Sequence, residues 1–318
     1  MEHKRVSIVL SLYNEEANLE KLFKELSKVE ATLADQVKIE YLCVNDGSED
    51  GTLETLIRLS QTYPNIRIYN LFRNFGHEIA MSAGMDQATG DCILFMDGDL
   101  QHPPELIEPM VLSWLEGHEV VLTRKITRDQ EKSRLYSLLS RAHFALLNAL
   151  SDIKIPRDFP DFRLLDRKQI ETLKQFDEKD RMFRGLLNFI GYHNAKVIDF
   201  EVPPRYAGET KYTFRRSAQL VVDSLLQFST KPLRLATYLG LVSVSITTVI
   251  GLMTLIEYLF FNTERSGYAT TLLVIIFMGS IQLIVLGIIG EYIGKIHMEV
   301  KKRPLYFGEW VEPDRSRG

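Results

Sequence analysis

The sequence contains few cysteines and no excess of basic residues, and each shortage excludes a class of protein. Only Cys43 and Cys92 occur among 318 residues, too few for a disulfide framework. Both lie in apolar runs, so we expect reduced thiols in the core of a cytoplasmic domain. The chain has 38 basic and 42 acidic residues, a formal net charge of −4, so no nucleic acid partner is indicated. Glycine and proline are at ordinary levels, which excludes collagen-like and low-complexity chains.

Two common nucleotide-binding motifs are also missing. No G-x-G-x-x-G follows the first apolar run, and no G-x-x-x-x-G-K-[ST] occurs in the chain. These patterns surround phosphates with backbone N–H groups, so their absence excludes the usual dinucleotide-binding and P-loop sites.

Ionisable residues almost vanish near the C-terminus. No Asp, Glu, Lys, Arg or His occurs from Leu235 to Ile256 or from Tyr268 to Gly290. A helix of 23 residues, the length of the second stretch, spans roughly 35 Å against a hydrocarbon core of about 30 Å. A pair of buried core helices would also be apolar, but two such stretches in succession are rare in soluble chains. We therefore expect two transmembrane helices, at about 235–261 and 268–290.

The basic residues flanking these stretches predict the orientation of the spans. Arginine and lysine precede the first span and follow the second, whereas the connecting loop offers only Arg265 beside Glu264. By the positive-inside rule both chain ends lie in the cytoplasm. The predicted organisation is a cytoplasmic catalytic domain (1–212), a juxtamembrane amphipathic segment (213–234), the two spans (235–296) and a cytoplasmic tail (297–318).

The first half of the chain alternates short apolar runs with helical patterns. Because the runs are apolar throughout, we expect an α/β fold whose mostly parallel sheet is flanked by helices. Ligands of such sheets bind at the carboxyl ends of the strands. The predicted strands are Val6–Leu10, Ile39–Val44, Ile66–Leu71, Cys92–Met96 and Val120–Leu122, and the predicted helices are Glu15–Leu33, Thr52–Thr62, Glu78–Ala88 and Pro104–Leu115.

The loop after the fourth strand contains the sharpest chemical signal. Asp97 and Asp99 flank one glycine at the strand end. Two carboxylates that approach one point repel each other unless a cation lies between them, and Mg²⁺ takes such oxygen ligands together with substrate phosphates. Asp-Gly-Asp is also common in plain surface turns. Its position after an apolar strand, with a second acidic loop one strand away, favours the metal site.

Five segments together resemble one enzyme family. They are LSLYNEE, VNDGSEDGT, RNFGHEIAMSAG, MDGDLQHPPE and DFRLLDRK, in that order. The chain resembles a family 2 glycosyltransferase with a GT-A fold, from the branch that transfers a sugar from a nucleotide sugar to polyprenyl phosphate. That branch includes dolichol-phosphate mannose synthases and bactoprenol glucosyltransferases, and the two C-terminal spans favour the bacterial form. The resemblance implies an inverting enzyme of the bacterial plasma membrane that transfers glucose from UDP-glucose to undecaprenyl phosphate for a cell-envelope glycan.

The resemblance also implies roles for individual residues. Asp97 and Asp99 would hold Mg²⁺ or Mn²⁺ on the diphosphate of the nucleotide sugar, with Gln101 just beyond them. Asp161 would be the catalytic carboxylate. Pro160 stands where the family commonly has glycine, so Asp158 is an alternative to Asp161. The remaining implied contacts are Leu12, Tyr13, Glu15 and Asp46 to the base and ribose, and Arg205 and Lys211 to the diphosphate or acceptor phosphate.

Several alternatives stay open at this point. Mannose from GDP-mannose, GlcNAc and a modified arabinose are alternatives to glucose. A processive polysaccharide synthase of the same fold would carry a Q-x-x-R-W motif, which no glutamine here begins. A catalytically silent membrane scaffold is disfavoured by the intact carboxylates.

Residues 135–150 and 218–228 fit amphipathic helices at the membrane surface or helices packed on the core. Small residues of the second span would allow a homo-oligomer, namely Gly279, Gly287, Gly290 and Gly294.

Overall fold

The computed structural model describes residues 3–126, 159–176, 195–201, 231–261 and 267–312. The chain divides into two compact units. The sheet unit contains the described residues up to 201 together with residues 303–312, and the hairpin unit contains residues 231–261 and 267–302.

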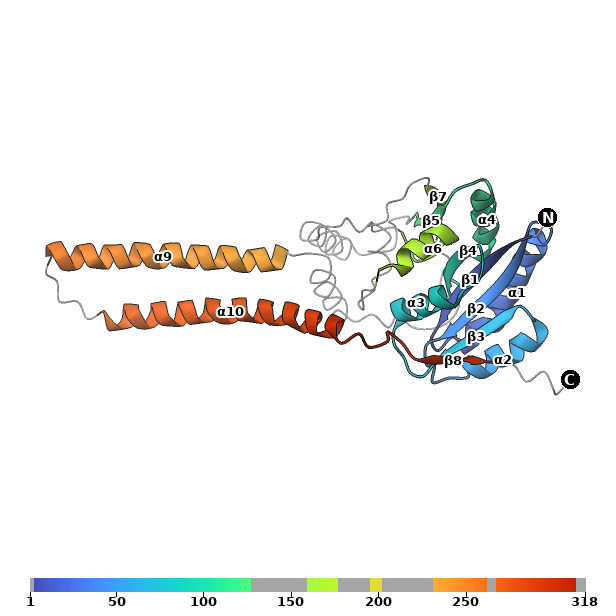
Figure 1. Ribbon diagram of the computed structural model, residues 1–318, viewed down its shortest axis with the longest axis horizontal. Coiled ribbons are helices and arrows are strands. Elements are labelled where there is room, and N and C mark those ends of the chain that lie inside the picture. The colour runs from blue at the N-terminus through green and yellow to red at the C-terminus, as the bar shows by residue number, and fades with distance from the viewer. Residues whose placement is uncertain (1–2, 127–158, 177–194, 202–230, 262–266, 313–318) are drawn as a thin grey trace. The chain divides into compact units, whose positions relative to one another are not determined.

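The sheet unit is built on one eight-stranded sheet in the order β7-β5-β6-β4-β1-β2-β3-β8 (Figure 1). The central strands β4, β1, β2 and β3 run parallel, so their carboxyl ends share one edge. Strand β6 runs antiparallel to both β4 and β5, and β8 runs antiparallel to β3. The strands are β1 (Lys4–Leu12), β2 (Val37–Asn45), β3 (Ile66–Leu71), β4 (Cys92–Asp97), β5 (Val120–Lys125), β6 (Arg163–Asp166), β7 (Ala195–Phe200) and β8 (Gly308–Val311).

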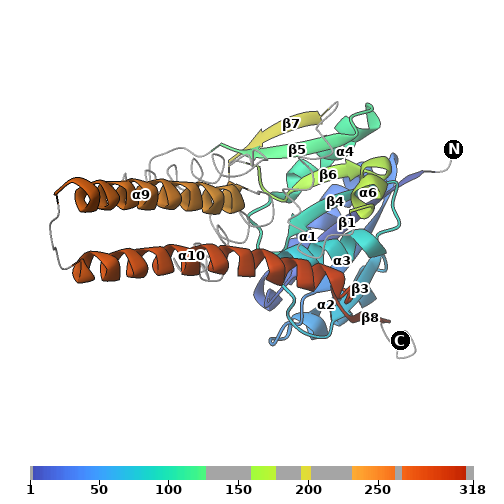
Figure 2. The same ribbon diagram turned by 60° about the vertical axis from the view of Figure 1, so that its left-hand side comes forward.

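Helices cover both faces of this sheet, as the predicted fold class requires (Figure 2). One core cluster joins α1 (Glu16–Leu33), α2 (Thr52–Thr62) and α4 (Ile107–Leu115) to the side chains of Ile8, Leu10 and Leu12. The other joins α3 (His77–Gln87) and α6 (Arg167–Lys174) to Val9, Val44 and Phe95. Residues alternate between faces along a strand, so consecutive positions at a strand end serve opposite sides of the sheet.

Strand β8 was not expected from the sequence, which predicts residues 297–318 as a tail. Its backbone pairs with β3, and Trp310 packs edge-on against Tyr69 with ring centroids 5.2 Å apart. The guanidinium of Arg67 lies 4.2 Å from the Trp310 ring centroid, a cation–π contact. The hairpin unit is therefore inserted within the chain of the sheet unit, because the chain returns to the sheet after residue 302.

The hairpin unit consists of two long apolar helices, α9 (Lys231–Phe261) and α10 (Tyr268–Val300). They lie side by side, with Ser243 and Thr247 of α9 against the sulfur of Met278 (Figure 1). Ala236–Ile256 and Val274–Val300 are long and apolar enough to cross a membrane. Large apolar side chains are exposed along both helices, which fits lipid as their surroundings better than water. They include Leu241, Val249, Leu252, Ile275, Leu283 and Leu286.

At the amino ends of β1 and β2, a buried carboxylate joins three segments. Glu40 accepts hydrogen bonds from the Ser7 hydroxyl and from the backbone N–H and hydroxyl of Thr89, and Arg67 lies 3.3 Å away. Burial alone would raise the pKa of Glu40, but these hydrogen bonds and the Arg67 charge outweigh it and lower that pKa.

Glu40→Gln should therefore destabilise the sheet unit. A lowered folded-state pKa means that ionised Glu40 stabilises the fold fully above its ordinary pKa of about 4.3, and that this contribution is lost as the pH falls through the folded-state value. We expect a loss of about 1–3 kcal/mol at pH 7, the cost of a disrupted buried hydrogen-bond set. Thermal unfolding of both proteins in detergent at pH 7 and pH 3.5 measures it. A difference that grows on acidification would contradict this assignment.

Candidate active site

The carboxyl ends of β1, β2 and β4 bring the predicted loops together at one edge of the sheet. In the β1–β2 register Leu12 is level with Asn45, and in the β1–β4 register Ser11 is level with Asp97. The β1 loop is also tied to the β2 loop, because Asn14 N–H donates to the Ser48 hydroxyl at 3.0 Å. Loops distant in sequence therefore form one surface, as expected for a parallel sheet.

Asp97 and Asp99 lie in a constrained turn at the end of β4. The Asp97 side chain is 34% exposed, and an oxygen of Asp99 accepts the N–H of Gln101 at 3.0 Å. A Cβ at Gly98 would lie 2.3 Å from Cδ2 of Leu12, so a larger residue there would require the Leu12 side chain to move. Leu100 has φ of 60° although it is not glycine, a backbone strain of about 1–3 kcal/mol of the kind that clusters at functional sites.

Asp161 lies beside this turn and is buried. In the antiparallel register Arg163 of β6 is opposite Phe95, which makes Asp161 level with Asp97 two residues further on. Asp161 is 3% exposed, and one of its oxygens accepts a hydrogen bond from Arg163 at 2.7 Å. The same guanidinium nitrogen donates to the Pro160 carbonyl at 2.9 Å. This buried ion pair fixes the position of Asp161.

His77, the first residue of α3, is a site residue that the sequence analysis missed. Its Nε2 lies 3.5 Å from an Asp97 oxygen and 3.8 Å from an Asp161 oxygen, and its Nδ1 lies 3.2 Å from the Ser11 hydroxyl. Partial desolvation lowers the pKa of His77, but the charges of Asp97 and Asp161 outweigh it and raise that pKa to about 9. The side chain is 41% exposed and therefore accessible to a ligand. The sequence feature that could have identified His77 is the RNFGHE segment, which follows a predicted strand.

Asp46 follows β2 and holds the loop before α3. It is 2% exposed, and its two oxygens accept the backbone N–H groups of Phe75 at 2.7 Å and Gly76 at 2.9 Å. Burial raises the pKa of Asp46, and these two hydrogen bonds oppose the rise. Asp46 therefore positions the loop that leads to His77, and its predicted contact with a nucleotide base stays a prediction.

The other predicted base and ribose contacts occupy different environments. Leu12 is fully buried in the core beneath Gly98. Tyr13 is half-buried at the loop surface. Glu15 accepts a hydrogen bond from the Asn18 amide at 2.6 Å, and its Cγ would lie 3.5 Å from a Cβ at Gly98. Glu15 is thus close to the Asp97–Asp99 turn, whereas Leu12 supports that turn from the core.

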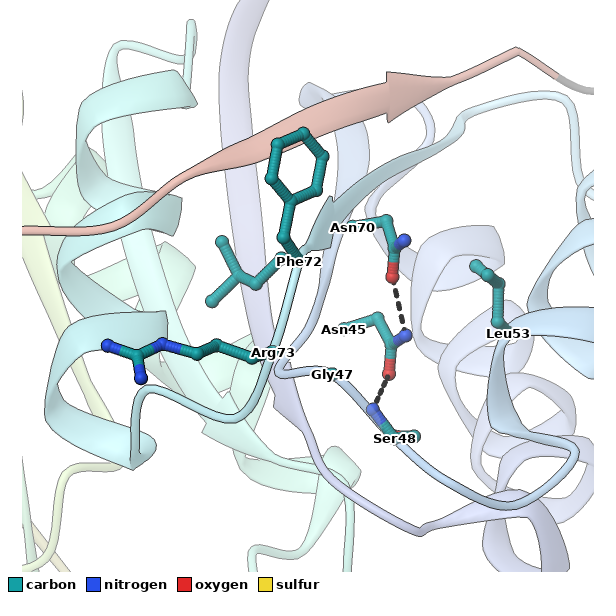
Figure 3. Close-up of a pocket in the computed structure, with 8 residues that line it drawn as sticks. Asn45, Gly47, Ser48, Leu53, Asn70, Phe72 and Arg73 are labelled. Atoms are coloured by element: carbon teal, nitrogen blue, oxygen red, sulfur yellow. Dashed lines mark hydrogen bonds between the residues drawn. The ribbon is translucent and has the colours of Figure 1, made fainter.

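A separate pocket of about 430 Å³ lies at the ends of β2 and β3 (Figure 3). The Asn45 amide donates to Asn70 at 2.7 Å, and Leu53 of α2 forms part of the wall. Asn45 and Asp46 are consecutive and serve opposite faces of the sheet, so this pocket lies on the α2 face while the Asp97 cluster lies on the α3 face. Gly47 lines this pocket: its φ is +61°, and a Cβ there would lie 2.2 Å from the Arg73 backbone.

Several predicted residues fall outside the described residues. These are Asp158, Arg205, Lys211 and the segments 135–150 and 218–228.

The number of carboxylates at this turn is compatible with the predicted metal ion. Among the described residues no group of three or more His, Cys, Asp or Glu side chains is arranged to hold a metal ion. Mg²⁺ at phosphate-transfer sites usually takes only one or two carboxylates and completes its shell with substrate phosphates and water. Asp97 and Asp99, separated by one glycine and partly exposed, match that requirement.

Comparison with known proteins identifies the family. Residues 7–174 match Glycosyl transferase family 2, and residues 231–296 match the GtrB C-terminal hairpin. An uncharacterized glycosyltransferase of Synechocystis is 40% identical over 301 residues, covering 95% of this chain and 93% of that protein. A prophage bactoprenol glucosyl transferase homolog of Escherichia coli is 34% identical over 302 residues, covering 95% and 97%.

Among solved structures, a mannosyltransferase of Pyrobaculum calidifontis in complex with GDP-Man and Mn²⁺ is 16% identical, with a TM-score of 0.45, covering 92% of this chain and 88% of that one. The family matches and the mixed sheet confirm the predicted fold class and the predicted enzyme class. The chain is a glycosyltransferase and belongs to glycosyltransferase family 2.

Proposed function

We propose that this enzyme transfers glucose from UDP-glucose to undecaprenyl phosphate in the plasma membrane, with inversion at the anomeric carbon. The observation that carries the proposal is the presence, in one chain, of a family 2 domain and the GtrB hairpin. Relatives in Escherichia coli and a Shigella phage that match over nearly their whole length are named for bactoprenol glucosyl transfer. In this proposal the catalytic domain and both chain ends face the cytoplasm.

The chemistry of the reaction matches the charges at the sheet edge. The nucleoside diphosphate gains negative charge as it leaves, and a divalent ion held by Asp97 and Asp99 would stabilise that charge when bound. Gln101 lies next to this turn. Arg205 and Lys211 are proposed to contact the phosphates. Tyr13 and Glu15 are proposed to border the base and ribose.

Asp161 is proposed to orient the reacting groups and not to remove a proton. The second pKa of a phosphate monoester is near 6, so the acceptor is mostly ionised at pH 7 and needs little help from a base. The ion pair with Arg163 supports this role, because a carboxylate locked in a buried pair is held in one position. Attack on the face opposite the leaving group converts an α-linked donor sugar into a β-linked product.

The first test is a panel of UDP-glucose, GDP-mannose and UDP-GlcNAc with the full-length protein and undecaprenyl phosphate. We expect labelled lipid from UDP-glucose only, a β-linkage by NMR, and no product in EDTA until Mg²⁺ or Mn²⁺ is restored. Asp99→Asn should lower turnover by about 10²-fold or more, as expected for the loss of an electrostatic stabiliser. Transfer from GDP-mannose alone would show that the donor sugar is mannose and not glucose. Full activity in EDTA would show that the reaction needs no metal ion.

Asp46→Asn tests the nucleotide contact. An amide can accept only one of the two N–H groups that the carboxylate accepts, so we expect UDP affinity to fall about tenfold, on the order of 1.4 kcal/mol. Isothermal titration of the full-length protein measures it, with exposed Glu49→Gln from the same loop as the matched control. Faster hydrogen exchange at Phe75 and Gly76 in the free protein would assign the loss to loop position. Unchanged exchange would assign it to direct contact, and an unchanged affinity would place Asp46 outside the site.

Asp161→Asn tests the positioning role. The amide keeps an acceptor for Arg163 but cannot act as a base, so the loss of rate should be nearly the same at pH 6 and pH 8. Asp161→Ala leaves Arg163 buried without its carboxylate and should lose more activity and about 3–5 kcal/mol of stability. pH–rate profiles with thermal unfolding separate the two effects. A loss for Asp161→Asn that is much larger at pH 6 would show that Asp161 acts as a base.

A further inference from the structure

His102 occupies the gap between the two acidic segments of the site. Strands β4 and β6 pair only as far as Phe95 and Arg163, so the backbone of Asp97 extends beyond that ladder. The Nδ1 of His102 accepts the Asp97 N–H at 3.0 Å, in the place that a strand partner would otherwise fill. His102 is 2% exposed, so it cannot touch a substrate directly without rearrangement.

The same imidazole contacts the segment that carries Asp161. Its ring stacks on Phe162, the residue after Asp161, with centroids 4.9 Å apart and an interplanar angle of 10°. Phe162 is itself fully buried, and its carbonyl accepts the Thr123 hydroxyl at 2.7 Å. A single buried side chain therefore joins the Asp97 turn to a rigid part of the Asp161 segment.

The hydrogen bond also determines the orientation of the imidazole. Because Nδ1 accepts from a backbone N–H, the ring proton of the neutral form is on Nε2, which lies 3.7 Å from an Asp97 carboxylate oxygen. The backbone and the side chain of Asp97 thus face opposite nitrogens of one ring. A change in the ring would move the carboxylate as well as the strand end.

We infer that His102 is a positioning residue: it holds the Asp97 carboxylate in the place where the metal–diphosphate group of the donor is bound, and it keeps that place in register with Asp161. The inference rests on the proposed metal-dependent function. It predicts that the acceptor atom at Nδ1 matters more than the size or stacking of the ring.

Two substitutions separate these contributions. In His102→Asn the amide oxygen replaces Nδ1 as acceptor while the stacking is lost. In His102→Phe the ring and its stacking are kept, but the buried Asp97 N–H has no acceptor from residue 102. The matched control is Trp114→Phe, which removes another side-chain hydrogen bond, from the indole N–H to Asp166 at 2.8 Å, away from the sheet edge that carries the site.

The readout is binding of Mn²⁺ to the full-length protein in the presence of UDP, followed by electron paramagnetic resonance, with thermal unfolding alongside. We expect His102→Phe to weaken Mn²⁺ affinity tenfold or more, and His102→Asn to stay within about threefold of the unaltered protein. Trp114→Phe should lower the unfolding temperature without changing Mn²⁺ affinity. Since no transfer is measured, a wrong sugar or acceptor would leave these outcomes unchanged.

Unaltered Mn²⁺ affinity in His102→Phe would overturn the inference, as would equal losses in His102→Asn and His102→Phe. Failure of the unaltered protein to bind Mn²⁺ with UDP would overturn it too. If His102→Phe does not fold, His102→Asn decides: unchanged hydrogen exchange of the Asp97 amide together with a tenfold loss of Mn²⁺ affinity would show that the acceptor atom alone does not hold the site.

Discussion

Repulsion between carboxylates at one sheet edge is the constraint on which the site depends. Asp97 at the end of β4 and Asp161 just before β6 both lie within 4 Å of the His77 imidazole, so their charges must be balanced. Arg163 balances Asp161 from within the core, and His77 approaches both carboxylates from α3. In the proposed function the partly exposed Asp97–Asp99 turn would attract a cation together with a diphosphate. The loop leading to α3 supplies His77 and the start of β6 supplies Arg163, so both segments contribute the positive charges that offset the carboxylates near the β4 turn.

Burial assigns different roles to carboxylates of the same sheet edge. Asp161 is enclosed with its partner Arg163, and Asp46 accepts two backbone N–H groups, so the protein fixes the position of both carboxylates. Asp97 and Asp99 lie in a strained turn and keep partial exposure, so they can exchange protein contacts for ligand contacts. Residue type alone does not make this distinction, because all four are aspartates that follow or precede strands. Their environment makes it.

The sequence was informative where the signal was local. The apolar runs predicted the first five strands, and Asp97 and Asp99 were recognisable because they follow one of those runs directly. The burial of Leu12 could also have been predicted from the sequence, since Ile8, Leu10 and Leu12 are alternate residues of one strand and share one face of the sheet. For His77 the RNFGHE segment indicated only a loop after a strand, and β8 had no local signal. Their partners are distant in the chain, and no local pattern marks an antiparallel register or a returning edge strand.

The inserted position of the hairpin has a consequence for catalysis at a membrane. The chain returns to the sheet unit after residue 302, and β8 is fastened to β3 by backbone pairing and by the Tyr69–Trp310 contact. The chain of the sheet unit therefore continues on both sides of the hairpin, before residue 231 and after residue 302. The proposed polyprenyl phosphate acceptor cannot leave the bilayer, so in the proposed reaction both chain connections would keep the catalytic unit at the membrane.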